Sequence, residues 1–179
     1  MFLQFRFTLA GVCSLATLFS TFTTSIAISI LQVDTSVGKV HGFINGTHPD
    51  VVQFLGIPYA EPPIGDRRWT APAPKSSVGN IDATRFGPAC SQYVSEVPST
   101  YSIDAREFLV DGSFSEDCLA LSIWAPFTPK GEENTACDKL PVVVWIYGGD
   151  HQNGGGNVKY QQPAPWVQRS QEFIFVQVK

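Results

Sequence analysis

Two runs of glycine, Gly148-Gly149 and Gly154-Gly155-Gly156, are the residues of this chain whose type and spacing point most directly to chemistry. Glycine has no side chain, so its backbone N–H group can approach an anionic ligand or transition state closely. Gly149 and Gly154 have the spacing of a phosphate-binding loop, but Gly155 stands where that loop needs lysine, which excludes it. The remaining chemical interpretation is a loop that donates N–H groups to the oxyanion of an acyl-transfer reaction, and a plain turn is the alternative.

The other side chains that could act as nucleophile or base form weaker patterns. Ser36 and Lys39 match the S-x-x-K pattern of penicillin-binding enzymes, but that motif opens a helix, whereas Ser36 precedes a turn glycine among β-branched residues. His41, His48 and His151 have no serine and carboxylate partner by motif, and His151 is interpreted as a surface residue of the glycine loop. The 179 residues contain no G-x-S-x-G nucleophile motif. No His/Cys spacing suggests a metal, and no cofactor is expected.

A short apolar strand over 142–146 must position the first glycines. Its sequence, Val-Val-Val-Trp-Ile, has no polar alternation and is too short for a helix, so we expect a strand buried on both faces. Residues 173–178 are predicted to form a second apolar strand, and residues 163–171 a short helix with proline at its start. This order is typical of an α/β sheet, in which active sites lie at the carboxyl ends of the strands.

The residues before this strand are predicted to form short strands and an ordered loop. Gly38 marks the turn of a small hairpin. Prolines at 58, 62 and 63 deny backbone donors to a central strand, so residues 56–69 are expected to be an extended loop rather than sheet. Residues 91–115 lack a clear period and are expected to be a surface excursion. The expected strands in this part are 33–35, 39–43, 51–55 and 119–123.

The amino-terminal residues 1–27 have the pattern of a secretory signal peptide. One charge, Arg6, precedes an apolar stretch that ends in Ser25-Ile26-Ala27, which is typical of signal-peptidase sites. A membrane anchor is the alternative, but serines and threonines from 20 to 25 interrupt the apolar run, and no other segment is apolar enough to span a membrane. We therefore expect a secreted, extracellular protein with a mature domain over 28–179.

The mature chain would be acidic and would enter an oxidising compartment. The sequence has 12 basic and 16 acidic residues, and removal of Arg6 leaves a net charge of −5, which disfavours nucleic acid and anionic membranes as partners. Cys90, Cys118 and Cys137 remain after the signal, so one disulfide and one further thiol are expected. Asn45 begins an Asn-Gly-Thr glycosylation sequon in a turn-like setting.

Four segments together resemble the amino-terminal third of type-B carboxylesterases/lipases, the family of cholinesterases and secreted fungal lipases. They are Phe54–Pro63 with Gly65, Arg68 and Trp69; Gly87–Cys90; Ser115–Leu119; and Pro141–Gly149. The resemblance runs from about Val33 to Lys179. It implies the amino-terminal part of an α/β-hydrolase fold, with a small β-hairpin region and the first strands of the central sheet, incomplete as it stands.

The resemblance gives the glycine loop a specific role. Tyr147-Gly148-Gly149-Asp150 matches the family's Tyr/His-Gly-Gly-Gly oxyanion loop, whose second and third glycines donate their N–H groups. Asp150 replaces the third glycine. Its side chain would restrict the backbone angles of the donor, and its carboxylate would oppose the charge of the oxyanion. Loss of one such donor typically costs about 3–4 kcal/mol of barrier.

The resemblance also implies two structural links. Cys90 and Cys118 match the family's first disulfide, which would stabilise the fold by roughly 3–4 kcal/mol in the chain-entropy model. Cys137 has no family partner within this chain. Arg68 and Glu116 match a buried ion pair that holds the proline-rich loop, and removal of one partner of such a pair would cost about 3–5 kcal/mol. Two solvated surface charges are the alternative.

The activity that the resemblance implies is carboxylic ester hydrolysis by serine acyl transfer, on a small-molecule or lipid ester. The family's serine elbow, acid and histidine lie downstream of the last strand seen here, so the chain alone is expected to be inactive. Two alternatives stay open. One is a non-catalytic carboxylesterase-like binding or adhesion protein, in which Asp150 would reflect the loss of the oxyanion loop's catalytic role. The other is an unstable truncated product of poor solubility with exposed sheet edges.

Overall fold

The computed structural model describes residues 31–127 and 140–179. Its strands are β1 (Gln32–Thr35), β2 (Gly38–His41), β3 (Phe43–Asn45), β4 (His48–Pro58), β5 (Asn80–Asp82), β6 (Ala89–Cys90), β7 (Phe114–Ser115), β8 (Ala120–Pro126), β9 (Val142–Ile146) and β10 (Ile174–Val178). Its helical segments are η1 (Gly65–Arg67), α2 (Thr100–Ile103), η2 (Arg106–Phe108), η3 (Lys159–Gln161) and α3 (Ala164–Ser170). The predicted signal peptide 1–27 and Cys137 lie outside the described residues.

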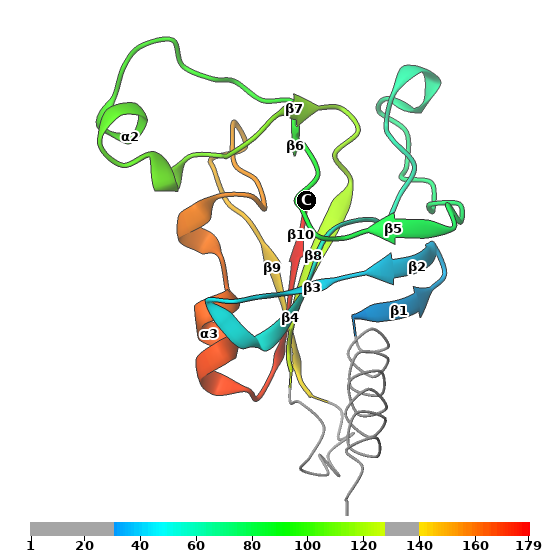
Figure 1. The fold of residues 1–179 in the computed structure, drawn as a ribbon. Coiled ribbons are helices and arrows are strands. Elements are labelled where there is room, and N and C mark those ends of the chain that lie inside the picture. The colour runs from blue at the N-terminus through cyan, green and yellow to red at the C-terminus, as the bar shows by residue number, and fades with distance from the viewer. Residues whose placement is uncertain (1–30, 128–139) are drawn as a thin grey trace, which may run out of the picture.

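The largest sheet has five strands in the order β3-β4-β8-β10-β9. Its last two strands, β9 and β10, are parallel and pair from Val142 with Ile174 to Ile146 with Val178. The other neighbours in this sheet are antiparallel. Helix α3 packs beside β4 and β8 (Figure 1), which completes a mixed α/β arrangement. The two apolar strands that were predicted over 142–146 and 173–178 are confirmed.

A second sheet has three strands in the order β1-β2-β5. Its strands β1 and β2 form the predicted hairpin. Gly38 closes this hairpin with φ of +133°, and a Cβ atom there would collide with the carbonyl oxygen of Gly79, so only glycine fits. The single strand predicted over 39–43 is interrupted at Gly42, and the chain then enters the larger sheet as β3.

Strand β4 is longer than predicted and includes two prolines, Pro49 and Pro58. Pro58 pairs with Ala120 of β8, so the expectation that this proline lies outside the sheet is wrong. The register shifts between Phe54 and Ile57, and Gly56 within this bulge has φ of +71°. Pro58 follows the bulge as the last residue of the strand, and a missing N–H group is tolerated at such a position.

Two hydrophobic cores pack against the two faces of β4. Side chains alternate along the strand, so Val52 and Phe54 belong to one core and Val51 and Leu55 to the other. The first core lies towards the three-stranded sheet and contains Val37, Val40, Val52, Phe54, Ile57, Ile81 and Ala83. The second lies towards α3 and contains Val51, Leu55, Trp124, Ala164, Val167, Phe173 and Phe175. Strand β4 is therefore covered on both sides.

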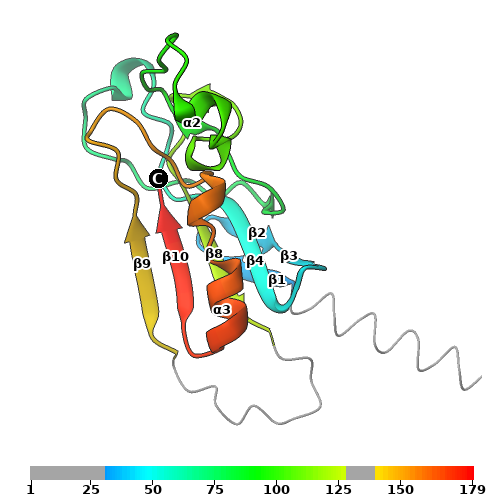
Figure 2. The same ribbon diagram turned by 90° about the vertical axis from the view of Figure 1, so that its left-hand side faces the viewer.

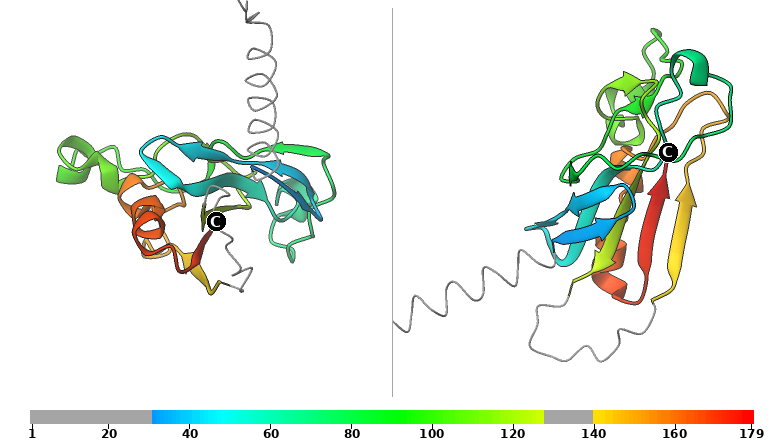
Figure 3. Two further views of the ribbon diagram at one scale, coloured as in Figure 1. Left: turned by 60° about the horizontal axis from the view of Figure 1, so that its bottom comes forward. Right: turned by 90° about the vertical axis from the view of Figure 1, so that its right-hand side faces the viewer.

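Strand β9 has the predicted secondary structure but not the predicted burial. Val142, Val144 and Ile146, which share one face of the strand, are 55%, 59% and 76% exposed. In the described part of the chain β9 is the last strand of its sheet. The three-stranded sheet lies over β4 and does not extend across β10 and β9 (Figure 3, right). The expectation of a strand buried on both faces is therefore wrong for the described residues.

The remaining predicted elements are found where the sequence placed them. Helix α3 begins directly after Pro163, buries Ala164 and Val167, and is capped after Ser170 by Gln171 with φ of 57°. The predicted surface excursion over 91–115 is confirmed, because it carries α2 and η2, whose residues are not buried.

Candidate active site

The glycine loop leaves β9 at the edge of the sheet where both parallel strands end. Strands β9 and β10 run in the same direction, and residues 147–156 continue from β9 at that edge (Figure 2). Parallel strands bring the loops that follow them to one edge, which is where open α/β sheets bind ligands. The loop therefore lies where the sequence predicted an active site.

A tight turn shapes the first part of this loop. The carbonyl oxygen of Gly149 accepts hydrogen bonds from the N–H groups of Gln152 and Asn153, at 3.0 and 3.2 Å. Asp150 and His151, in the middle of the turn, have φ of 56° and 58°. Positive φ at both central residues is typical of type I′ turns, and aspartate is enriched among the non-glycine residues that adopt it. Asp150 therefore holds a conformation that glycine would adopt without strain.

Close packing inside the loop requires glycine at two positions. A Cβ atom on Gly149, whose φ is +148°, would collide with the carbonyl oxygen of Asn153. A Cβ atom on Gly154 would lie 2.5 Å from the carbonyl oxygen of Gly148 and 2.7 Å from Cδ2 of Tyr147. Any larger residue at either position would force the backbone of the loop to move.

The N–H groups at the start of the loop have no acceptor in the part of the chain that the structure describes. Among the hydrogen bonds of these residues, none uses the N–H group of Gly148, Gly149 or Asp150 as donor. Gly148 and Asp150 are exposed and Gly149 is half-buried, so these donors are open to water or to a ligand in the cavity. Consecutive unpaired N–H groups beside a cavity are the arrangement that stabilises a developing oxyanion.

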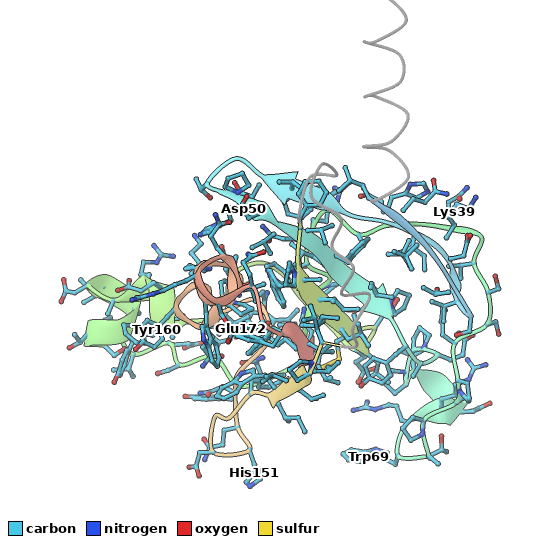
Figure 4. The ribbon with its side chains drawn as sticks, turned by 90° about the horizontal axis from the view of Figure 1, so that it is seen from below. Lys39, Asp50, Trp69, His151, Tyr160 and Glu172 are labelled. Carbon is cyan, nitrogen blue, oxygen red and sulfur yellow. A yellow bond between two sulfur atoms is a disulfide. The ribbon has the colours of Figure 1, made fainter. Side chains whose placement is uncertain are left out.

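An open cavity of about 420 Å³ lies beside these N–H groups. It is lined by residues 90–92 and 147–154. Its volume falls within the range of small-molecule sites. His151 lines its rim, is exposed, and lies at the outer end of the loop (Figure 4), in agreement with its interpretation as a surface residue.

The predicted disulfide between Cys90 and Cys118 is present. It joins the wall of the cavity to the residues that precede β8. The two cysteines are separated by 28 positions, and closing a loop of that size stabilises the fold by roughly 3–4 kcal/mol in the chain-entropy model. The surface excursion over 91–115 is thereby tied to the sheet at both ends.

Arg68 and Glu116 form an ion pair, but the pair is not buried. Arg68 Nη2 lies 3.0 Å from Glu116 Oε1, and the side chains are 53% and 38% exposed. The expectation of a buried pair is wrong, because the loop around Arg68 lies on the surface next to Trp69, which is 95% exposed. Such a pair contributes about 0–1 kcal/mol, rather than the 3–5 kcal/mol expected for a buried pair.

The other candidate residues lie away from the cavity. Asn45 is exposed at the β3–β4 turn, where its Oδ1 accepts hydrogen bonds from the backbone N–H and the hydroxyl of Thr47, at 3.1 and 3.0 Å. Ser36 and Lys39 lie in the β1–β2 hairpin, so the S-x-x-K motif lacks the helix start that it needs.

The described residues 31–127 and 140–179 contain neither a candidate metal site nor a candidate membrane-spanning helix. No three His, Cys, Asp or Glu side chains among them gather in a way that could hold a metal ion. No helix within these two ranges has the length and apolar character needed to cross a bilayer.

Two titratable groups near the cavity edge of the sheet have shifted pKa values. Burial lowers the pKa of Lys179 to about 8, and its Nζ donates to the carbonyl oxygens of Gly87 and Pro88 at 2.7 and 3.1 Å. Burial, and to a smaller extent the nearby Tyr147 phenol, raises the pKa of Tyr59, whose hydroxyl donates to the carbonyl oxygen of Lys179. The Lys179 side chain thus links the end of β10 to the segment before the disulfide, and Tyr59 links it to the residue that follows β4.

The sequence did not identify Gln92 as part of the cavity wall. Its side-chain amide is hydrogen-bonded to both backbone groups of Gly154. The only signal in the sequence is its place two residues after Cys90. A side chain that pairs with the backbone of a residue 62 positions away leaves no local pattern.

Comparison with known proteins agrees with this geometry. A sequence model of the carboxylesterase family matches residues 29–178. A chlorogenic acid esterase of Aspergillus niger is 43% identical over 148 residues, which cover 82% of this chain and 28% of that protein. Secreted lipase 5 of Gibberella zeae is 36% identical over 160 residues, covering 83% of this chain and 30% of the lipase. An acetylcholinesterase of Danio rerio is 40% identical over 133 residues, covering 72% of this chain and 20% of that enzyme.

The chain thus spans less than a third of the length of the curated relatives that it matches. The family model covers most of the chain, including the cavity, the disulfide and the glycine loop. The chain therefore belongs to the carboxylesterase family, as the four segments of its sequence indicated.

Proposed function

We propose that this chain is the amino-terminal part of a secreted carboxylic ester hydrolase with an α/β-hydrolase fold, and that residues 148–150 supply its oxyanion-hole donors. In this proposal residues 1–27 are a signal peptide and residues 28–179 belong to the catalytic domain. The observation that carries it is the set of backbone N–H groups without an acceptor, in the described part of the chain, beside the cavity of about 420 Å³. Such donors stabilise the tetrahedral intermediate of acyl transfer.

The rest of the chemistry would come from residues outside this chain. A serine acyl transfer needs a nucleophile, a histidine base and an acid, and the 179 residues contain no G-x-S-x-G motif. The chain by itself is therefore proposed to be inactive. Its own contribution would be to hold the oxyanion donors and one wall of the site in place.

The substrate is proposed to be a small-molecule or lipid ester. The printed names of the relatives, a chlorogenic acid esterase and a lipase, support esters as the class, and the name secreted lipase 5 supports secretion. The acidic balance of 12 basic and 16 acidic residues gives no support to a nucleic-acid partner.

The test is to express the complete product of the gene and to measure hydrolysis of p-nitrophenyl esters of increasing acyl length. Gly149→Ala is expected to lower kcat by about 100-fold or more with little change in KM, because the loop must move and a donor is lost. Gly46→Ala is the matched control, since a Cβ there meets nothing within 4 Å. Equal activity of wild type and Gly149→Ala would contradict the proposed role.

A non-catalytic binding protein is a second candidate, and Asp150 is the observation that favours it. A carboxylate at the rim of the cavity opposes an oxyanion. Asp150→Gly removes this charge and keeps a residue that accepts φ of 56°. In an esterase this change is expected to raise kcat by about 10-fold, which is less than the change of about 100-fold or more that loss of one oxyanion donor typically causes. A protein in which both forms fail to react with a fluorophosphonate serine probe would instead be the binding protein.

An unstable product is a third candidate, supported by the exposed face of β9. Apolar residues at an open sheet edge promote association between chains. Residues 28–179 expressed alone are expected to aggregate in size-exclusion chromatography. A monomeric peak with cooperative unfolding would contradict this candidate.

Asn45 is proposed to carry an N-linked glycan, because it is exposed at a turn and its Oδ1 is hydrogen-bonded to Thr47. The secreted protein should lose the mass of one glycan after enzymatic deglycosylation, whereas Thr47→Ala should start at the lower mass. Equal masses of the two proteins before treatment would rule out the modification.

A further inference from the structure

The side chain of Gln92 forms two hydrogen bonds with Gly154 at the end of the glycine loop. The N–H group of Gly154 donates to Gln92 Oε1 at 2.8 Å, and Gln92 Nε2 donates to the carbonyl oxygen of Gly154 at 2.7 Å. Nε2 also donates to the carbonyl oxygen of Cys90 at 3.0 Å. Both donors of the amide are therefore used, and the half-buried side chain pairs with Gly154 as a neighbouring strand would.

Gly154 is in turn packed against the first residues of the loop. Its α-carbon approaches the carbonyl oxygen of Gly148 and the ring of Tyr147 so closely that a Cβ atom would not fit. Gly149 is packed more closely still, because a Cβ atom there would lie at an even shorter distance from the carbonyl oxygen of Asn153. Because Gly154 packs against Gly148, and its neighbour Asn153 against Gly149, the position of Gly154 constrains the start of the loop.

The other end of this linkage is anchored covalently. Gln92 lies two residues after Cys90, which is bonded to Cys118 just before β8. Residues 90–92 and the loop line the same cavity. A rigid anchor on one wall of the cavity is thus connected to the loop on the other.

We propose that Gln92 is a positioning residue: its amide clamps Gly154 and thereby aims the N–H groups of Gly148, Gly149 and Asp150 into the cavity. The catalytic consequence rests on the proposed esterase function, whereas the clamp itself does not. The role requires a glutamine, since the position needs a donor and an acceptor in one planar group. Glutamate has the shape but lacks the N–H donors, and leucine lacks both donor and acceptor.

The first measurement is hydrogen exchange of the complete secreted protein, followed by mass spectrometry of peptides from 147–156. Gln92→Glu and Gln92→Leu are expected to speed exchange in these peptides by about 10-fold or more. Leucine loses both hydrogen bonds to Gly154, whereas glutamate loses the donor to the Gly154 carbonyl and places a carboxylate oxygen against it. Peptides from β4 should exchange as in the wild type. Unchanged exchange of 147–156 in both variants would overturn the clamp.

Gln168→Leu is the matched control. Gln168 on α3 also makes a two-point contact, accepting from the N–H group of Asp50 at 3.1 Å and donating to its carboxylate at 2.6 Å. Asp50 and His151 lie at opposite ends of the molecule in Figure 4. This substitution should leave exchange in 147–156 and ester hydrolysis unchanged, so a loop effect as large as that of Gln92→Leu would overturn the assignment.

The second measurement separates positioning from folding. A glutamic acid side chain regains a hydrogen-bond donor when it is protonated, which happens below about pH 4.3. The exchange rate of Gln92→Glu divided by that of the wild type at the same pH should therefore return towards one as the pH falls below that value. Gln92→Leu should show no such recovery. If Gln92→Leu also loses protection in β4, the pH response of Gln92→Glu decides, and a flat response overturns the clamp.

Kinetics then test the link to catalysis. In Gln92→Glu at pH 7, kcat is expected to fall about 10-fold while KM stays within about twofold, because a misplaced donor weakens binding of the transition state more than that of the ester. A wild type without activity would refute the proposed function and leave the exchange results to decide on the clamp. An active wild type whose kcat is unaffected in both Gln92 variants would refute the positioning role alone.

Discussion

Strands β4 and β9 belong to the same sheet and are both rich in apolar residues, yet their surroundings are opposite. Val51 in β4 is fully buried, whereas Val144 in β9 is 59% exposed. Helix α3 and the three-stranded sheet cover the two faces of β4, and only the side of Val143 in β9 packs against a core. The place of a strand in the sheet, rather than its composition, determines how much of it is buried.

The loops at the carboxyl edge are held differently from the core. Around the cavity the contacts are a disulfide, a glutamine clamp and tight glycine packing, rather than a cluster of buried apolar side chains. Regions with little two-sided packing depend on a few specific links. Each of the following changes tests this contrast.

The largest effect is expected at the disulfide. Replacement of Cys90 and Cys118 together by serine should lower the free energy of unfolding by about 3–4 kcal/mol, since the unfolded chain regains the freedom of the loop between them. Pulse proteolysis in urea would measure the loss. The wild type in the presence of reductant should have the same free energy of unfolding as the double variant. A loss below about 1 kcal/mol would mean that noncovalent packing, rather than the disulfide, keeps residues 91–115 in place.

A matched pair of valines sharpens the contrast between the strands. Val51→Ala should cost about 2–3 kcal/mol, because two buried methyl groups are lost and a cavity remains. Val144→Ala should cost less than about 0.5 kcal/mol, because the side chain is already exposed in the described structure. Equal costs, measured in the same way, would indicate that the face of β9 is covered in the protein as produced.

A smaller effect is expected from pH, at the proline-rich loop that follows β4. The backbone N–H of Ser76 and, after it, Lys75 lower the pKa of Glu61 to about 2 from its ordinary value of 4.5. The folded pKa is lower than the unfolded one, so this contact stabilises the fold above pH 4.5, and the contribution is lost as the pH falls towards 2.

The variant Glu61→Gln should therefore show a flatter decline of stability between these pH values than the wild type, when urea midpoints are compared from pH 2 to 6. Asp34→Asn, at an exposed position of β1, serves as the control for loss of one carboxylate. An equal decline of the urea midpoint with falling pH in wild type and Glu61→Gln would contradict the contribution of Glu61.

Much of the fold followed from local patterns. The runs of β-branched residues over 142–146 and 173–178, the proline before α3 and Gly38 in its turn each depend on neighbours in the sequence, and all were predicted. The disulfide was predicted because its cysteines lie in two recognisable segments.

The features that escaped prediction depend on distant partners. Pro58 could join β4 only because a bulge at Gly56 changes the register before it. The exposure of β9 and of the Arg68–Glu116 pair depends on which layers cover them. Gln92 acts on a residue 62 positions away. None of these relations has a period or motif that could be read along the chain.

The order of strands also has a consequence for synthesis. Strand β10 lies between β8 and β9, so in the described fold β9 has no ladder partner until residues 174–178 have been made. The 28 positions between Ile146 and Ile174 take roughly 1–6 seconds to translate at typical rates of 5–20 residues per second. During that interval the five apolar residues of β9 have no strand partner and are open to association with other apolar surfaces.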